Sequence, residues 1–331
     1  MNAGETSPVG AGTSFVRPEW ACEASVGRPK PEQPDGVRNA FQRDRDRIIH
    51  AKAFRRLMHK TQVFISPDGD HFRTRLTHTL EMAQVSRTIA RSLGLNEDLT
   101  EAIALGHDLG HTPFGHTGEG ALTRVLAVHG RAFRHNEHSL RVVDVLEKDH
   151  QGLNLTHEVR DGIRNHTGKG YPLTREGEVV RISDRIAYVN HDVDDAIRAG
   201  VIRFDDLPKG PIAVLGDRMS GRIDTLVRDM IVTSKEKGEI GLSDKVYEAL
   251  MELRAWLFKN VYNNPRSREN EKAGGVVAAL FEYYLERPDE RAKSDPDPIT
   301  ETVDFVAGMT DRYALATYRQ IFLPRSDTIF G

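Results

Sequence analysis

The chain has 331 residues, enough for one large domain or two smaller ones, and carries a formal net charge of −3 from 46 basic and 49 acidic residues. This balance predicts solubility and excludes a global attraction to nucleic acid, while leaving room for local basic patches. The single cysteine, Cys22, excludes an internal disulfide framework and a cysteine-cluster zinc site, which fits a reducing cytoplasm. Residues 1–20 lack an apolar signal-peptide core, and no run approaches the roughly 18 apolar residues of a membrane span. We therefore expect a cytoplasmic protein without membrane contact.

The N-terminal segment is rich in proline and predicts an extended or partly disordered arm over residues 1–40. Five of the fifteen prolines fall within residues 1–36. From residue 40 onward, apolar residues recur at the spacing of helical turns, and sustained period-two alternation is hard to find. The best strand candidate, residues 178–182, runs directly into a helical pattern. We therefore predict an all-α fold, with a helical core over residues 41–200 and a helical C-terminal region over residues 201–331 that packs on this core.

Apolar periodicity also places individual helices along the chain. Ser243 and Thr300 precede amphipathic runs and are predicted N-caps, because their side-chain oxygens can accept hydrogen bonds from the first helical turn. The charged, proline-bearing residues 287–298 predict a loop before the last helix. The predicted helices cover segments around residues 49–57 and 80–93, and then residues 97–108, 118–128, 137–148, 156–165, 176–198, 211–234, 243–260, 268–286 and 300–321.

Residues 105–119, with the sequence LGHDLGHTPFGHTGE, concentrate ionisable side chains beside residues that let the chain bend. Three histidines and two carboxylates share this stretch with four glycines and a proline. His107 and His111 lie one helical turn apart and share a face if the helix continues that far. A His–Asp dipeptide alone is most often a surface or capping pair. Burying five such groups without partners would cost several kcal/mol, which indicates a metal ion or solvent in a pocket.

Two other segments offer side chains that would complete a metal site. Upstream, His78 stands at the start of a predicted helix, with Arg75 one turn before it. Downstream, Asp184, Tyr188 and Asp192 are spaced by four residues and lie along one stripe of a helix whose apolar flanks indicate burial. A buried carboxylate calls for a partner. For Asp184 this partner is either a metal ion or a neighbouring arginine.

The order His78, then His107 and Asp108, then Asp184 is the H…HD…D signature of the HD-domain metal phosphohydrolases. More narrowly, the chain resembles the deoxyguanosinetriphosphate triphosphohydrolase-like branch of that superfamily. The resemblance implies an HD-domain helical bundle with additional C-terminal helices. The segments that carry it cover residues 43–200 almost continuously and lie at 43–64, 73–91, 107–119, 135–143 and 181–200.

The resemblance implies one divalent metal ion held by two imidazoles and two carboxylates. This mixed nitrogen and oxygen set suits Mg, Mn, Fe, Ni or Zn and does not choose among them. Four protein ligands leave positions on an octahedral ion for water and a phosphate oxygen, as a hydrolase needs. The implied ligands are His78, His107, Asp108 and Asp184.

The implied reaction is attack of water at the α-phosphorus of a deoxynucleoside triphosphate (dNTP) such as dGTP, which yields a deoxynucleoside and intact triphosphate. His111, His116 and Glu119 are the implied acid–base group, since a histidine transfers protons readily near neutral pH. By the same resemblance, Tyr188 covers the C2′ face of the sugar and leaves no room for a ribose hydroxyl, while Asp192 binds the 3′-hydroxyl. The implied substrate contacts are Gln62, Arg75, His135, Arg185, Tyr188 and Asp192.

Two other functions stay open at this point. One is another HD phosphohydrolase that acts on nucleoside monophosphates or on a guanosine tetraphosphate alarmone. The HTPFGH and HTGE motifs beyond the His–Asp pair argue against it, because a minimal HD phosphatase lacks them. The other is a regulatory protein that binds nucleotides or single strands and keeps a vestigial metal site. The presence of all the expected catalytic residues argues against this second alternative.

Partners are also implied by the resemblance. We expect a homo-oligomer, and a dNTP effector is a further candidate partner. The charged run at residues 43–47 is either a basic patch for an effector or single-stranded nucleic acid, or a solvated, salt-bridged face. His135 has the alternative role of capping the next helix. Seven other histidines lack such a constellation, and most of them are expected to be solvated or structural: His50, His59, His71, His129, His150, His157 and His166.

Overall fold

The computed structural model describes residues 20–62, 73–262 and 268–324 of the chain. These residues form helices joined by loops and contain no β-strand; their one β feature is an isolated bridge between Thr61 and Thr74. The all-α prediction is therefore confirmed, and the strand candidate at residues 178–182 lies inside a helix. Of the predicted N-terminal arm, residues 1–19 lie outside the described residues.

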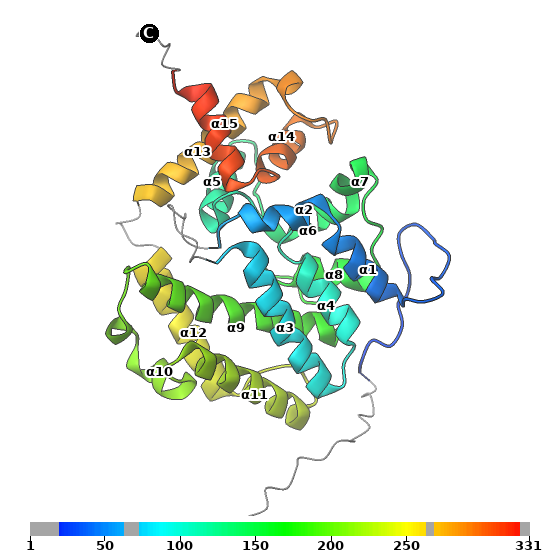
Figure 1. Cartoon of the computed structure of the whole chain (residues 1–331), viewed down its shortest axis with the longest axis vertical. Helices are drawn as coiled ribbons and strands as arrows, with labels where there is room; N and C mark the ends of the chain where they lie inside the picture. Colours follow the sequence, from blue (N-terminus) through cyan, green and yellow to red (C-terminus); the bar gives the residue numbers. More distant parts are fainter. Residues whose placement is uncertain (1–19, 63–72, 263–267, 325–331) are drawn as a thin grey trace, which may run out of the picture.

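The helices lie largely where the apolar periodicity predicts them along the chain, and Figure 1 shows their arrangement. Helix α9 has 24 residues and carries the predicted stripe of Asp184, Tyr188 and Asp192. No described helix is long and apolar enough to cross a membrane. The α-helices are α1 (Ala40–Ile49), α2 (Lys52–Arg56), α3 (Arg75–Leu93), α4 (Glu97–Gly106), α5 (Gly115–Ala127), α6 (His135–Arg141), α7 (Glu147–His150), α8 (His157–Asn165), α9 (Arg175–Arg198), α10 (Lys209–Leu215), α11 (Met219–Lys237), α12 (Asp244–Leu257), α13 (Arg268–Glu286), α14 (Pro298–Ala307) and α15 (Asp311–Phe322).

Three local predictions are wrong. The predicted helix over residues 300–321 is divided into α14 and α15 by the non-helical residues 308–310. The predicted helix over residues 211–234 is divided into α10 and α11, because Gly216 ends α10 with a φ of 114°, a conformation that glycine tolerates. Thr300 is not an N-cap. It lies in the first turn of α14, whose N-cap is Asp297, and its backbone N–H donates to the Asp297 carboxylate at 3.0 Å. Ser243 does stand at the N-cap position of α12, but its side chain makes no capping hydrogen bond.

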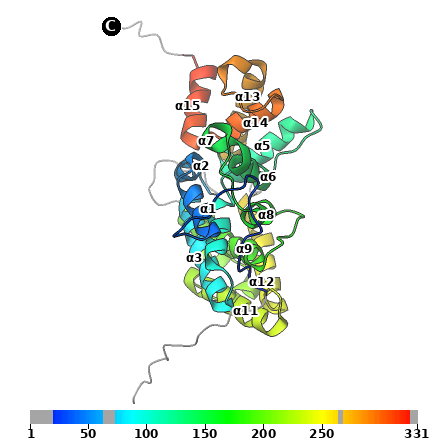
Figure 2. The ribbon, with the colours of Figure 1, turned by 90° about the vertical axis from the view of Figure 1, so that its right-hand side faces the viewer.

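Apolar side chains gather in three buried clusters that share helices. The first lies between α3, α9 and the group α10, α11 and α12. The second lies between α1, α3, α4, α8 and the same α9. The third packs α5 against α13, α14 and α15 at the other end of the molecule, which is elongated and narrow in one direction (Figures 1 and 2). Because α9 faces two clusters, the polar side chains in its middle must find polar partners inside the protein.

The segment before α1 runs along the helical core, where buried carboxylates hold it. Glu158 accepts the backbone N–H of Val26 at 2.6 Å, and Glu176 accepts that of Cys22 at 3.0 Å. Both glutamates lie on the core helices α8 and α9. Residues 20–39 therefore form an extended segment that is tied to the core by hydrogen bonds.

Candidate metal centre and active site

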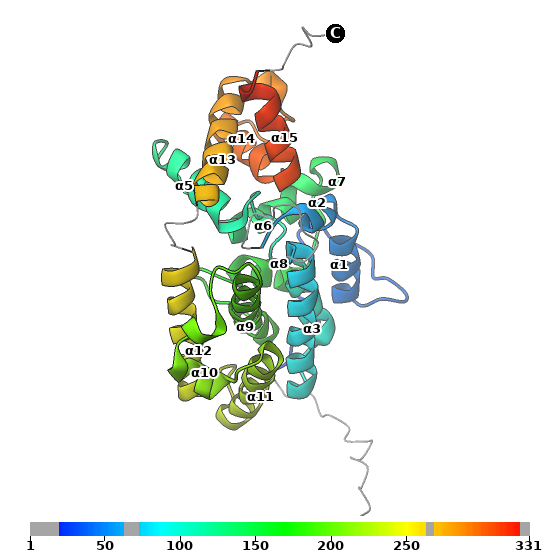
Figure 3. The ribbon, with the colours of Figure 1, turned by 60° about the vertical axis from the view of Figure 1, so that its left-hand side comes forward.

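The four predicted metal ligands come from α3, from the two residues directly after α4, and from α9; α3 and α9 lie side by side (Figure 3). His78 lies in the first turn of α3, His107 follows the last residue of α4, and Asp184 lies within α9. His78 Nε2 lies 3.2 Å from Asp184 Oδ1, and His107 Nε2 lies 3.7 Å from the same oxygen. His107 Nε2 also lies 3.5 Å from Asp108 Oδ2. The structure thus brings all four side chains together at a largely buried point.

His107 leaves one ring nitrogen without a protein partner. Its Nδ1 lies 2.7 Å from the carbonyl oxygen of Ala104, which can only accept, so Nδ1 carries the proton. Nε2 therefore presents a lone pair, and this buried atom has no hydrogen-bond partner among the described residues. Leaving such an acceptor unsatisfied is costly, and here it faces two carboxylates. A divalent cation would satisfy all of these groups, so the residues present fit a metal ion.

Both carboxylates of this group are held in the ionised form. Burial acts to raise the pKa of Asp108, but the electrostatic interaction with the neighbouring His107 and with the Arg75 guanidinium outweighs it and holds that pKa well below its usual range. Burial also acts to raise the pKa of Asp184, but its close contact with His78 and the neighbouring His107 lower that pKa overall. The group therefore offers two negative charges and two imidazoles, a donor set for borderline or hard divalent ions.

Arg75 reaches this point from the first residue of α3 and is buried. Its Nη1 donates to Asp108 Oδ2 at 2.5 Å, whereas Nε and Nη2 have no hydrogen-bond partner in the described part of the chain. Two buried, unpaired guanidinium donors suit phosphate oxygens. Gly115 makes room for them, because a Cβ there would lie 2.9 Å from Nη2, and its φ of 55° lies in the left-handed region.

The predicted acid–base residues lie beside the metal-binding group, in and around α5 and α6. The rings of His111 and His135 stack with their centroids 4.2 Å apart. The Glu119 carboxylate accepts from both the backbone N–H and the Nδ1 of His135, each at 3.0 Å. His116 Nδ1 lies 3.5 Å from the same carboxylate, and its side chain is 64% exposed. The structure therefore brings the four residues into one group with His116 at its outer edge.

Burial and charge push the two stacked imidazoles in opposite directions. Burial and the nearby Arg75 charge lower the pKa of His111, which is therefore neutral near pH 7. Burial also opposes charge on His135, but the hydrogen bond and the charge of Glu119 outweigh it and raise the pKa of His135. The pair combines a neutral ring with one that favours the cationic form. A cationic imidazole next to the metal-binding group suits an anionic substrate.

His166 joins this group, although the sequence predicted only a solvated or structural histidine. It caps the end of α8, is buried, and its Nδ1 donates to the carbonyl oxygen of Ile163 at 2.7 Å. Its Nε2 is then an acceptor and lies 3.2 Å from the Nε2 of His135. Burial, with the charges of His107 and His135, lowers the pKa of His166 to about 3. A single histidine at a helix end gives no sequence signal, since only the packing of α8 places it here.

Tyr188 and Asp192 contact residues from the C-terminal region. The hydroxyl of Tyr188 accepts a hydrogen bond from Arg254 Nε, and Tyr262 donates its hydroxyl proton to Asp192 Oδ2. Asp192 Oδ1 has no partner among the described residues. Burial raises the pKa of Asp192 to about 7, although the hydrogen bond from Tyr262 acts against this. Sequence reasoning missed Arg254 and Tyr262, because only the packing of α12 and of the turn that follows it (Phe258–Tyr262) brings them to the stripe on α9.

Gln62 and Arg185 complete the predicted set, and both keep polar groups without partners among the described residues. Gln62 is buried with an unpartnered Oε1, and it lines a cavity of about 530 Å³ together with His116 and Tyr262. Arg185 is half-buried and forms no hydrogen bond or ion pair with the described residues. The cavity therefore lies between His116, at the outer edge of the acid–base group, and Tyr262, whose hydroxyl contacts Asp192 on α9.

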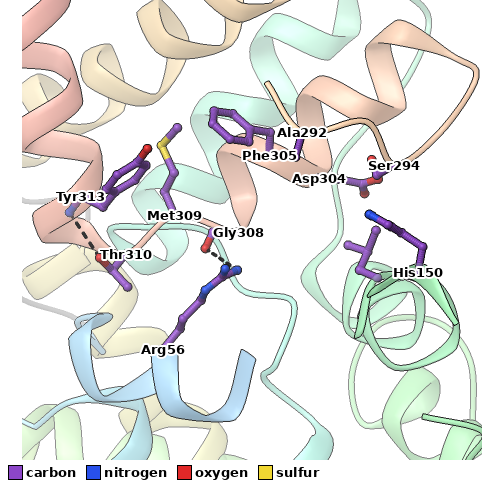
Figure 4. Close-up of a pocket in the computed structure, with 11 residues that line it drawn as sticks. Arg56, His150, Ala292, Ser294, Asp304, Phe305, Gly308, Met309, Thr310 and Tyr313 are labelled. Atoms are coloured by element: carbon purple, nitrogen blue, oxygen red, sulfur yellow. Dashed lines mark hydrogen bonds between the residues drawn. The ribbon is translucent and has the colours of Figure 1, made fainter. Parts of the chain in front are cut away.

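A second cavity, of about 490 Å³, lies between α2, α7, α14 and α15 (Figure 4). Arg56, Phe305, Met309 and Tyr313 line it, and Arg56 Nη1 donates to the carbonyl oxygen of Gly308 at 3.1 Å. None of the predicted site residues lines this cavity. Its wall is the turn between α14 and α15, which belongs to the C-terminal helices.

Residues 75–189 match the HD domain family, and residues 240–320 match the phosphohydrolase-associated domain. A protein of Caldanaerobacter subterraneus subsp. tengcongensis named deoxyguanosinetriphosphate triphosphohydrolase-like protein is 58% identical over 308 residues, which cover 91% of this chain and 90% of the relative. A protein of the same name from Desulfatibacillum aliphaticivorans is 48% identical over 339 residues, covering 94% and 95%. The chain belongs to the deoxyguanosinetriphosphate triphosphohydrolase-like family.

The family assignment makes the chain an HD-domain hydrolase with a group of residues able to hold a metal ion. A crystal structure of a hypothetical protein from Aquifex aeolicus shares the fold, with a TM-score of 0.53 and 18% identity over 86% of this chain and 68% of that chain. All four predicted metal ligands fall within the HD match. The phosphohydrolase-associated match contains Arg254 and Tyr262, so this second region of the family forms part of the site wall.

Proposed function

We propose that this chain is a metal-dependent triphosphohydrolase that converts a dNTP such as dGTP, with water, into a deoxynucleoside and triphosphate. The observation that carries the proposal is the group of His78, His107, Asp108 and Asp184, in which a buried imidazole lone pair faces two ionised carboxylates. The names of the relatives at 58% and 48% identity support a deoxyguanosine triphosphate as substrate.

These four residues would hold one divalent ion. When bound, the ion would polarise the α-phosphate and stabilise the negative charge that develops there. The buried position of the group supports this role, since electrostatic interactions are stronger where water is excluded. Two imidazoles and two carboxylates do not select among Mg, Mn, Fe, Ni and Zn.

Positive groups around the centre would bind the rest of the triphosphate. Arg75 offers its unpaired Nε and Nη2, and its third donor group keeps Asp108 in place. His135 favours the cationic form because Glu119 lies beside it. Arg185 lies next to Asp184 in sequence and forms no hydrogen bond or ion pair with the described residues. Charge-assisted hydrogen bonds from these groups would fix the phosphate chain with its α-phosphate at the metal-binding group.

Proton transfer would fall to His116 and Glu119. Hydrolysis removes one proton from water and delivers one to the 5′-oxygen, as the bond between that oxygen and the α-phosphorus breaks. Burial acts to raise the pKa of Glu119, but its hydrogen bonds with His116 and His135 outweigh this and lower it, so Glu119 stays ionised. An ionised carboxylate beside an exposed imidazole holds the ring ready to exchange protons. Neutral His111 would contact the α-phosphate or the leaving oxygen.

The stripe on α9 would hold the sugar. The Tyr188 ring would cover the C2′ face, and the unpartnered Oδ1 of Asp192 would accept a hydrogen bond from the 3′-hydroxyl. Gln62, whose Oε1 has no partner among the described residues, would contact the edge of the sugar from the other side. We also propose that the region over residues 201–331 packs on a catalytic core over residues 41–200 and supports this pocket, because Arg254 and Tyr262 orient the two stripe residues.

Product analysis tests the proposal. The purified full chain is incubated with each dNTP singly and in mixtures, with Mg or Mn, and the products are separated by anion-exchange chromatography. Triphosphate and deoxynucleoside are the expected products. Release of monophosphate, phosphate or pyrophosphate would indicate a different phosphohydrolase, and no turnover of any dNTP would favour a regulatory protein. A rate that rises only in mixtures would identify an effector dNTP, and the oligomeric state is measured on the same preparation by light scattering.

A further inference from the structure

We infer that His191 is a positioning residue that fixes the tautomer and the orientation of His78, and that it thereby sets the affinity of the site for its divalent ion. The inference rests on the assignment of His78 as a ligand in the proposed function. His191 carries no predicted role, and it lies on α9 between the stripe residues Tyr188 and Asp192, directly before Asp192.

His191 is in direct contact with the ring of His78. Their Nδ1 atoms lie 3.3 Å apart, and the two rings meet edge to face with centroids 5.5 Å apart. Both side chains are almost fully buried, with exposed fractions of 0% and 3%. Because both rings are buried, their Nδ1 atoms must satisfy each other, so one Nδ1 donates and the other accepts.

The far side of His191 decides which nitrogen donates. Its Nε2 lies 3.1 Å from a carboxylate oxygen of Glu81, which can only accept, so Nε2 carries the proton. The Nδ1 of neutral His191 is then an acceptor and takes the Nδ1 proton of His78. As a result, the neutral ring of His78 presents its lone pair on Nε2, the atom that lies 3.2 Å from Asp184. In the opposite tautomer of His191, the lone pair of Nε2 would face the Glu81 carboxylate, and the proton on Nδ1 would face the protonated Nδ1 of His78.

Glu81 is itself held in place. Arg73 Nε donates to its carboxylate at 3.0 Å, and Arg73 Nη1 donates to Asp195 at 2.8 Å. The chain of contacts therefore runs from Asp195 on α9 to Glu81 on α3, and returns through His191 on α9 to His78 on α3. Closing the chain between two packed helices fixes the position of each member.

The tautomer of His107, the other imidazole ligand, is fixed by a backbone group. His107 Nδ1 donates to the backbone oxygen of Ala104, an acceptor that a side-chain substitution cannot remove. The tautomer of His78 is instead fixed by the side chains of His191 and Glu81, which can be removed by substitution. Histidines that ligate metals almost always donate their second nitrogen proton to such a partner, and the partner tunes affinity without touching the ion.

Metal affinity measured on the full chain tests the inference. The metal-free protein is titrated with Mn²⁺ and Co²⁺ in competition with a fluorescent chelator, and the absorption spectrum of the Co²⁺ form is recorded. We expect His191→Phe, which keeps a ring but removes the acceptor, to weaken binding by roughly tenfold to a hundredfold and to change the Co²⁺ spectrum. His191→Asn places an acceptor oxygen near the position of Nδ1, and we expect it to recover most of the loss.

Two further variants separate positioning from packing. His138→Phe makes the same change at a buried histidine that contacts Gly110 and Asp304, outside the His78 chain, and should leave the Mn²⁺ affinity unchanged. Glu81→Leu removes the anchor of His191 from a half-exposed position, so it tests the inference even if His191→Phe does not fold, and it should also weaken binding. Thermal unfolding of each metal-free variant reports its packing separately.

Each outcome has one meaning. Unchanged affinity in His191→Phe or in Glu81→Leu, or equal losses in His191→Phe and His191→Asn, would overturn the inference. A His78→Ala variant that loses the ion while His191→Phe keeps it would overturn only the role of His191. Wild-type protein that binds neither Mn²⁺ nor Co²⁺ would overturn the metal centre itself and this inference with it.

Discussion

Asp311 accepts the backbone N–H of Phe114 on its Oδ1 at 3.0 Å, so the first residue of α15 holds the loop between the metal-binding pair and His116. Phe114 has a φ of 60°, a left-handed conformation that costs a non-glycine residue about 1–3 kcal/mol. The second carboxylate oxygen accepts from the N–H and the hydroxyl of Thr61, at 3.0 and 2.7 Å. The C-terminal helices therefore fix the shape of the loop that carries the acid–base group.

Asp311→Ala should lower kcat for dGTP by roughly tenfold to a hundredfold without releasing the metal ion. Three hydrogen bonds to a charged group are lost, each worth about 1.5–3 kcal/mol, and the strained Phe114 conformation loses its support. Thr61→Val removes only the hydroxyl bond and should have a much smaller effect. Turnover and metal content are measured on the same samples. Full activity in Asp311→Ala would show that the loop keeps its shape without α15.

Lys60 supports the same loop and gives the protein a pH-dependent stability. Its buried Nζ donates to the carbonyl oxygens of His111 and Ala307, and burial lowers the pKa of Lys60 to about 7. In the unfolded chain the pKa is near 10.4, so between about pH 7 and pH 10 the unfolded state binds more protons than the folded state. The contribution of this group to stability therefore increases as the pH rises through that window.

The difference in Tm between wild type and Lys60→Met isolates this contribution, because other titrating groups cancel in the comparison. We expect the difference to shift in favour of wild type between pH 7 and pH 9. A difference that does not change with pH would mean that Lys60 stays charged in the folded protein.

Much of the candidate site was open to prediction because its residues sit close together in sequence or at helical spacing. His107 and Asp108 are neighbours, and the four-residue steps from Asp184 to Asp192 define a stripe on any helix. His166 and His191 could not be found in this way. His166 contacts His135 through a ring nitrogen, and His191 contacts His78 in the same way. Each partner lies on another helix, so the pairing depends on tertiary packing.

The limits of the fold prediction have the same origin. Apolar periodicity located α9 and its burial, but it joined α10 to α11, because a repeat of apolar residues carries no information about the φ of Gly216. The hydrogen bonds of Arg254 and Tyr262 with the stripe on α9 span 66 and 70 residues of sequence. Local patterns therefore predict elements and faces, whereas contacts between distant helices need the structure.

His116→Ala should abolish turnover while leaving the metal ion bound. The side chain of His116 is 64% exposed and lies 3.5 Å from Glu119, outside the group of four ligands. Loss of a positioned acid or base typically costs about 10²–10⁴ in rate. Metal content and kcat are determined on one preparation, with Glu137→Ala on the exposed first turn of α6 as a neutral control. Simultaneous loss of metal and activity would make His116 a ligand instead.

Sugar discrimination tests the stripe on α9. The Tyr188 ring, one turn after Asp184, is expected to cover the C2′ face, and the unpartnered Oδ1 of Asp192 is expected to accept from the 3′-hydroxyl. Wild type should therefore cleave dGTP but not GTP. Above the pKa of about 7 of Asp192, where this carboxylate is ionised, it should cleave 2′,3′-dideoxy-GTP with a kcat/KM lower by roughly tenfold to a hundredfold, the cost of one hydrogen bond to a charged group. Tyr188→Ala should narrow the gap between dGTP and GTP.

Tyr188→Phe is the matched variant for this test, because it keeps the ring and removes only the hydroxyl that accepts from Arg254. If the ring excludes the ribose hydroxyl by contact, Tyr188→Phe should keep the preference for dGTP that Tyr188→Ala loses. The decisive measurement is kcat/KM for dGTP, GTP and dideoxy-GTP on all three proteins. Equal wild-type values for dGTP and GTP would refute the placement of the sugar on α9, and would leave the metal-binding group untouched, since its residues make no contact with the 2′ position in this arrangement.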